Sequence, residues 1–168
     1  MIELSTPLSK ESVTGLSIGD LISISGRIYT GRDMVLPKLV ELYKSGSLDS
    51  MGINLAGSVI FHTAVSPAGV GPTSSNKNDI EGNIPKLSEA GVLIHLGKGA
   101  LKKDTVRVMS ELGSIYAVIP PVTALLESKI ISRRVIAYEE YGMEAMFELD
   151  VSGFPAIVAA AAGESIYK

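Results

Sequence analysis

Apolar residues alternate with small polar residues over positions 21–30, a pattern typical of a β-strand with one buried face. Continuous apolar runs predict buried strands at 59–65, 92–96 and 114–119, and a final strand or extended segment at 154–159. Weaker patterns predict strands at 3–8, 133–138 and 144–151. Apolar residues at helical spacing predict helices at 34–43, 101–112 and 123–131, with a shorter helical piece within 78–91.

Local signals mark the ends of two of these helices. Asp33 is suited to the N-cap or first turn of the helix at 34–43, and Pro37 fits within its first turn. Gly113 is a natural residue to follow the helix at 101–112. Strands alternate with helices in the middle of the chain, while both ends are mainly β. The order of elements therefore predicts an α/β fold with a mixed sheet.

The sequence shows no internal repeat and no linker long enough to divide it, so we expect residues 1–168 to form a single domain. Hydrophobic residues make up 46% of the chain and charged residues 20%, which describes an ordinary globular protein. The net charge of −3 and the lack of a basic cluster argue against nucleic-acid binding. The N-terminus lacks the pattern of a signal peptide, and no apolar run approaches about 20 residues. We therefore expect a cytoplasmic protein that does not bind membranes.

The chain contains no cysteine and only two histidines, far apart in the sequence. It therefore has no thiolate nucleophile, cannot hold an iron–sulfur cluster by itself, and is a poor candidate for a self-contained zinc site. His62 and His95 both lie in apolar strand runs, where a buried histidine with a satisfied hydrogen bond is the commoner role. Any chemistry must use hydroxyls, carboxylates, Lys and Arg, or a cofactor carried by a partner.

Three junctions between a strand and the following loop place a cation beside glycine. They contain Arg32, Lys77 and Lys98. Glycine lets a ligand approach the backbone N–H groups, so the expected ligand is an anion with more than one charged group. Arg32 can hold a carboxylate through two hydrogen bonds, whereas a lysine acts as a point charge. Any one of these cations taken alone is more often a solvated surface residue.

Other patterns in the sequence are weaker indications of a functional site. The segment 91–99 has five residues between its glycines where a phosphate-binding Walker loop has four, and it ends in Gly where that loop has Ser or Thr. Adjacent acids at Glu139, Glu140 and Glu144 are more often solvated than catalytic. Thr73 is the hydroxyl of interest, because Lys77 lies four residues away and a nearby cation is needed to stabilise its alkoxide.

Six short motifs occur in one order along nearly the whole chain, and together they resemble a known family. The chain is similar to the β subunit, or C-terminal domain, of class I fumarate hydratases and L-tartrate dehydratases. The motifs are GD at 19–20 with SG at 25–26, TGRD at 30–33, GPTSS at 71–75 with Lys77 and Asp79, GKG at 97–99, YGMEA at 141–145 and FPA at 154–156.

The resemblance implies a swivelling β/β/α domain and a partner α subunit whose cysteines hold a four-iron, four-sulfur cluster. That cluster would act as a Lewis acid in the elimination of water from malate or tartrate. The lack of cysteine here fits such a division between chains. The implied function is that of a β subunit of a hydro-lyase that hydrates fumarate reversibly, active only with its α subunit. The alternatives are tartrate dehydration and a non-catalytic role in dicarboxylate binding or assembly. Self-association of the isolated chain is left open.

The resemblance also implies residue roles. Arg32 and Lys98 would bind the substrate carboxylates, Ser74 would contact the substrate, and Thr73 would accept the C3 proton. Lys77 stands where the family usually has Arg, and Asn78 where it usually has Met. The family's His after the Arg–Asp pair is also absent, with Leu36 in its place. The reaction type is therefore better indicated than the substrate.

Overall fold

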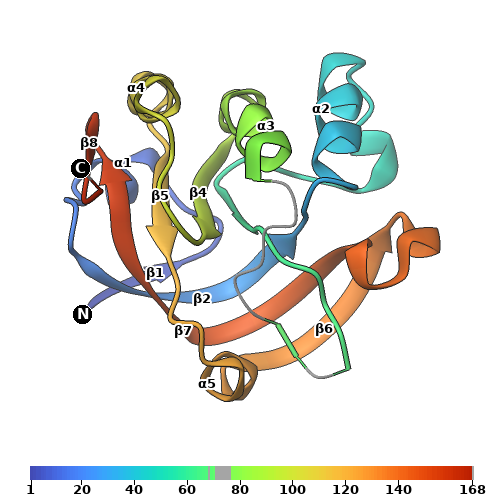
Figure 1. Cartoon of the computed structure of the whole chain (residues 1–168). Helices are drawn as coiled ribbons and strands as arrows, with labels where there is room; N and C mark the ends of the chain where they lie inside the picture. Colours follow the sequence, from blue (N-terminus) through green and yellow to red (C-terminus); the bar gives the residue numbers. More distant parts are fainter. Residues whose placement is uncertain (68, 71–76, 168) are drawn as a thin grey trace.

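The computed structural model describes residues 1–67, 69–70 and 77–167, except the side chains of Lys77 and Asp79. Its strands form one mixed sheet of eight (Figure 1). They are β1 (Ile2–Ser5), β2 (Leu21–Thr30), β3 (Ser58–Phe61), β4 (Val92–Gly97), β5 (Ile115–Val118), β6 (Ile130–Ala137), β7 (Met146–Ala161) and β8 (Glu164–Ser165). The α-helices are α1 (Lys10–Thr14), α2 (Leu36–Lys44), α3 (Lys77–Glu89), α4 (Lys103–Leu112) and α5 (Thr123–Ser128), and the 3-10 helices are η1 (Asp49–Met51) and η2 (Glu139–Glu144).

The sheet closes on itself through its longest strand, β7. Strands β1 to β5 lie side by side in sequence order, each parallel to its neighbour. Strand β7 then pairs antiparallel with both β5 and β2, which completes a ring of β2, β3, β4, β5 and β7. Among the residues that the structure describes, strands β6 and β8 pair only with β7. The parallel strands therefore all end at one edge of this ring.

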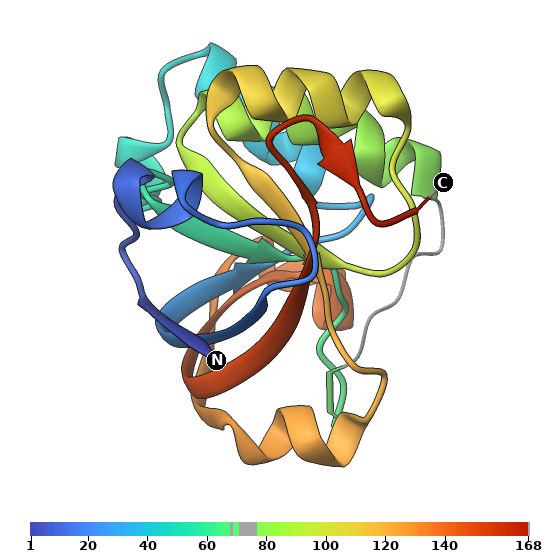
Figure 2. The ribbon, with the colours of Figure 1, turned by 90° about the vertical axis from the view of Figure 1, so that its left-hand side faces the viewer.

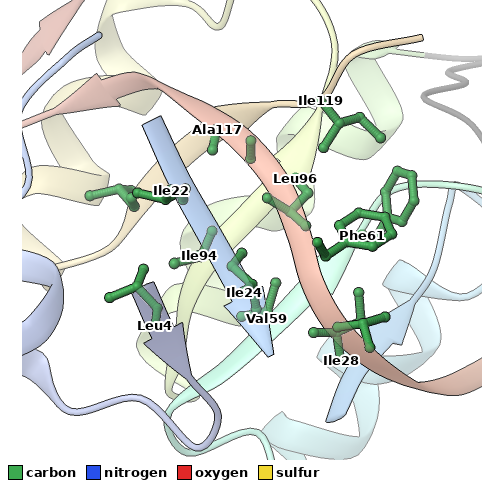
Figure 3. Close-up of a cluster of buried hydrophobic side chains, with 14 of the residues drawn as sticks. Leu4, Ile22, Ile24, Ile28, Val59, Phe61, Ile94, Leu96, Ala117 and Ile119 are labelled. Carbon is green, nitrogen blue, oxygen red and sulfur yellow. The ribbon is translucent and has the colours of Figure 1, made fainter. Parts of the chain in front are cut away.

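Apolar side chains fill the inside of the ring and the space beneath the helices. Ile22, Ile24 and Ile28 of β2 point into the first cluster together with Phe61 (Figure 3). Helices α2, α3 and α4 lie over one face of the sheet, and α5 lies on the opposite side of the molecule (Figure 1, Figure 2). The result is two β layers and one α layer. This arrangement confirms the predicted α/β fold with a mixed sheet.

Of the three local signals at helix ends, Pro37 and Gly113 are confirmed and Asp33 is not. Strand β2 spans the residues predicted for it. Helix α4 ends at Leu112 and is followed by Gly113, whose φ of 78° is the left-handed conformation that glycine favours. Pro37 lies in the first turn of α2. The prediction for Asp33 was wrong, because the N-cap of α2 is Val35 and the first turn of this helix contains no acidic residue.

Several predicted bounds also need correction. The strand predicted at 3–8 ends at Ser5, and the helix predicted at 123–131 ends at Ser128, because β6 begins at Ile130. The segments at 144–151 and 154–159 are parts of one continuous strand, β7. Between them Gly153 has a φ of 69°, and its N–H donates to Ser25 Oγ at 2.9 Å, so the glycine allows a local irregularity in the strand. Strand β3 ends at Phe61 and not at residue 65, because the Thr63 N–H turns back to the Phe61 carbonyl at 3.0 Å.

Candidate functional site

The site-bearing loops leave the same edge of three adjacent parallel strands. Strand β2 ends at Thr30, β3 at Phe61 and β4 at Gly97. Backbone hydrogen bonds continue just beyond the ends, from Gly31 N to Phe61 O at 3.0 Å and from His62 N to Leu96 O at 2.9 Å. The loops that carry Arg32 and Lys98 are thus separated by one strand, or about 10 Å at ordinary strand spacing. Ligands commonly bind at this edge of parallel strands.

Arg32 is oriented by an acidic residue from a distant part of the chain. Its Nε donates to Glu144 Oε1 at 2.7 Å, and Nη2 lies 2.6 Å from the same oxygen. The side chains are only 16% and 25% exposed, so this ion pair is partly shielded from water. Glu144 closes η2, and the Val65 N–H donates to the neighbouring Met143 carbonyl at 2.8 Å. The expectation that Glu144 is merely solvated was therefore wrong.

Lys98 is exposed, but its backbone is held in place. Its carbonyl accepts a hydrogen bond from the Tyr116 hydroxyl at 2.8 Å. Burial, with smaller contributions from Tyr167 and Glu81, raises the pKa of Tyr116, so the hydroxyl remains a donor near neutral pH. A Cβ on Gly97 would lie 2.7 Å from that hydroxyl, which explains why glycine precedes Lys98.

A buried carboxylate joins the Lys98 loop to helix α3. Glu81 Oε1 accepts a hydrogen bond from the Lys102 N–H at 2.6 Å, at the N-cap of α4. The bond satisfies one of the donors that the start of a helix leaves open. The sequence pointed to a helical piece here but not to this role for Glu81. The only signal was an acidic residue between Ile80 and Ile84, which face the core.

The two histidines lie next to each other in the core. His62 Nε2 lies 3.2 Å from His95 Nδ1, and the rings are parallel. His62 Nδ1 lies 3.3 Å from the Gly31 carbonyl, and His95 Nε2 lies 3.0 Å from Ser88 Oγ. Both are buried histidines with hydrogen-bond partners, as predicted, but the sequence did not pair them. The available signal was that His62 directly follows β3 while His95 lies within β4, the strand that pairs with it.

Burial keeps both histidines uncharged. Desolvation lowers the pKa of His62 to about 4, against a smaller opposing effect of the Gly31 carbonyl. Desolvation also lowers the pKa of His95 well below its ordinary value, and repulsion from His62 acts in the same direction. Neutral imidazoles are therefore the relevant forms at physiological pH.

The predicted site residues divide into two groups. The structure brings Arg32 and Lys98 to one edge of the sheet. Thr73 and Ser74 lie outside the described residues, as does the side chain of Lys77, although Lys77 is the first residue of α3. Within the described part of the chain, no group of three or more His, Cys, Asp or Glu side chains is placed to hold a metal ion. Within the same part, no helix has the length and apolar character needed to cross a membrane.

Comparison with known proteins places the sequence in a family. The family model described as "Fumarase C-terminus" matches residues 1–168. The chain belongs to this family. Within the fumarase C-terminus family, it is 34% identical to a putative L(+)-tartrate dehydratase subunit beta of Methanocaldococcus jannaschii, over 96% of this chain and 88% of that protein.

Two further relatives show how the family is organised. The L(+)-tartrate dehydratase subunit beta of Escherichia coli is 25% identical, over 92% of this chain and 80% of that protein. The anaerobic class I fumarate hydratase of Escherichia coli is 28% identical over 94% of this chain, but the match covers only 30% of that protein. In this family the domain thus occurs both in a subunit of similar length and as part of a longer chain.

Proposed function

We propose that the chain is the β subunit of a heteromeric hydro-lyase that reversibly hydrates fumarate to malate. The observation that carries the proposal is the placement of Arg32 and Lys98 on loops that follow β2 and β4, on either side of β3. Two loops that leave the sheet about 10 Å apart, each with a long cationic side chain, suit a four-carbon dianion. Family membership supports the reaction class.

Each proposed residue has a distinct role in binding or proton transfer. Arg32, held by Glu144, would bind one carboxylate, and Lys98 would neutralise the other. Ser74 would donate a hydrogen bond to the substrate. Thr73 would accept the proton from C3, and Lys77 would stabilise its alkoxide as a nearby positive charge. The roles of Thr73, Ser74 and Lys77 rest on the sequence resemblance.

The iron–sulfur cluster of this proposal belongs to the partner. Such clusters are bound mainly through cysteine thiolates, and this chain has no cysteine, so its residues do not fit the group. We therefore assign a four-iron, four-sulfur cluster to an α subunit. The contribution of this chain is limited to binding and orienting the substrate and moving its proton.

L-Tartrate is the second candidate substrate. It differs from malate by one hydroxyl group, so the same two cations suit its carboxylates. The specific observation in its favour is length: the chain covers 88% and 80% of two relatives named as tartrate dehydratase β subunits, but 30% of a class I fumarate hydratase. Rates of the two-subunit complex with fumarate, malate and L-tartrate would decide between them.

The test of the proposal is substitution of Arg32 in the complex with its α subunit. A hydrogen-bonded charge pair with substrate is worth about 1.5–3 kcal/mol, so Arg32→Ala should lower kcat/KM roughly 10- to 100-fold. The kcat/KM of Arg32→Lys should lie between those of the wild type and Arg32→Ala, because lysine keeps the charge but cannot form two parallel hydrogen bonds with a carboxylate.

Arg107→Ala is the matched control for this test. Arg107 forms two ion pairs on the exposed side of α4, with Asp104 and Glu111, and should leave the rate unchanged. If Arg32→Ala also leaves the rate unchanged, the chain has a non-catalytic assembly role and the proposal is wrong.

A further inference from the structure

A line of buried hydrogen bonds runs from Ser114, just before β5, to Gly31, the residue before Arg32. It joins Ser114, Ser88, His95, His62 and the carbonyl of Gly31. All four side chains are buried. Ser114 lies just before β5, Ser88 in α3, His95 in β4 and His62 in the loop after β3. None of them is used by the proposed reaction. A polar line through a core is costly unless every member is satisfied, so its arrangement needs an explanation.

The direction of every hydrogen bond in this line follows from its two ends. The Gly31 carbonyl can only accept, so His62 Nδ1 must carry a proton and donate. A neutral His62 then accepts at Nε2, which makes His95 Nδ1 the donor between the rings. His95 in turn accepts at Nε2 from Ser88.

The hydrogen bond at the Ser114 end of the line is consistent with donation toward Gly31. Ser88 Oγ accepts from the Ser114 hydroxyl at 2.8 Å, which leaves its own proton for His95. One set of tautomers therefore satisfies the whole line, with every donor pointing toward Gly31. The lowered pKa values of the two histidines favour the neutral forms that this set requires.

We propose that the buried pair His62 and His95 positions Arg32, by fixing the Gly31 carbonyl at the start of the loop that carries it. The loop is held at two further points: the Gly31 N–H donates to Phe61 O at 3.0 Å, and Glu144 binds the Arg32 guanidinium. A Cβ on Gly31 would lie 3.1 Å from Leu36, so the backbone is packed tightly as well. His62 and His95 are positioning residues, not catalytic ones.

The positioning role rests on the proposed function, in which Arg32 binds a substrate carboxylate. An arginine that grips the same carboxylate in the ground state and the transition state affects KM more than kcat. Loss of the hydrogen bond to Gly31 should therefore raise KM and change kcat little.

Two amide substitutions separate the two nitrogens of His62. Asparagine places its amide nitrogen near the position of Nδ1, so His62→Asn keeps a donor for Gly31. Glutamine reaches the position of Nε2, so His62→Gln keeps the contact with His95 and loses the donor to Gly31. In the two-subunit complex, we expect His62→Gln to raise KM about 5- to 10-fold with kcat within twofold, and His62→Asn to stay within about twofold of wild type in both.

A double-mutant cycle with Arg32→Ala then decides the route of the effect. If His62 acts through Arg32, His62→Gln should have no further effect on kcat/KM in the Arg32→Ala background. An equal loss in both backgrounds, or an equal rise of KM for the Asn and Gln variants, would overturn the positioning role. If Arg32→Ala alone has no effect, it is the proposed function that fails, and the two failures are thus distinguishable.

A second variant keeps the test usable if His62→Gln does not fold. Ser88→Ala removes the donor that fixes the tautomer of His95 and alters only one hydroxyl. It should raise KM in the same direction by a smaller factor, about 2- to 3-fold, and this rise should also vanish in the Arg32→Ala background. A rise that persists there would contradict the proposal.

Discussion

At the scale of single residues, the pairing of Arg32 with Glu144 defines the candidate site. The arginine could be selected from the sequence, because it follows a strand and a glycine. The acid could not, because it lies 112 residues further along the chain, among other acids that are exposed. A partly shielded ion pair fixes the direction of the guanidinium before the substrate binds. Substrate binding then costs little further side-chain entropy.

Removing Glu144 should weaken substrate binding without removing it. Glu144→Ala should lower kcat/KM of the complex about 10-fold, because Arg32 loses the hydrogen bonds that orient it. Glu144→Gln keeps an acceptor oxygen and should lower it only about 3-fold. Initial rates with fumarate measure both, with Glu140→Ala at an exposed position as the control. A rate within twofold of wild type for Glu144→Ala would show that Arg32 does not depend on this carboxylate.

At the scale of elements, the sequence predicted what local patterns control. The period of apolar residues placed β2, β4 and α4, and the glycine at 113 placed a helix end, because these depend on neighbours in the chain. The order of strands then brought Arg32 and Lys98 to one edge. The sequence did not predict the hydrogen bonds that hold these loops, from Tyr116 to the Lys98 carbonyl and from His62 to the Gly31 carbonyl. Each of these bonds depends on the register between strands.

The contact of the Tyr116 hydroxyl with the Lys98 loop can be tested by substitution of Gly97. A Cβ at this position would lie 2.7 Å from the Tyr116 hydroxyl, so Gly97→Ala should destabilise the chain by about 1–3 kcal/mol. In a Tyr116→Phe background the hydroxyl is absent, so the same substitution should cost less. Urea unfolding of the four chains gives the coupling. Equal costs in both backgrounds would contradict the contact.

At the scale of the whole molecule, the buried histidines link stability to pH. In the unfolded chain His62 has its ordinary pKa near 6.5, and in the folded chain a pKa of about 4. The unfolded state therefore binds more protons between these values, and stability falls as the pH falls from 6.5 to 4. Each such histidine contributes a slope of about 1.4 kcal/mol per pH unit in this range.

The His62→Asn variant isolates this contribution from the titration of carboxylates. The free energy of unfolding of the wild-type chain, measured by denaturant titration at several pH values, should fall more steeply with acidification than that of the variant. The difference between the two curves should change by about 1.4 kcal/mol per pH unit between pH 6 and 4.5. Parallel curves would show that His62 is not buried in its neutral form.

The proposed function divides the catalytic site between two chains, with Arg32 and Lys98 supplied by this chain and the iron–sulfur cluster by its partner. The most direct test is the loss of fumarate ultraviolet absorbance, measured anaerobically with the isolated chain, with the isolated α subunit carrying its cluster, and with both. We expect hydration activity only in the mixture, and its loss by at least 10-fold when the chain carries Arg32→Ala. Full activity from the isolated chain would contradict the two-subunit account.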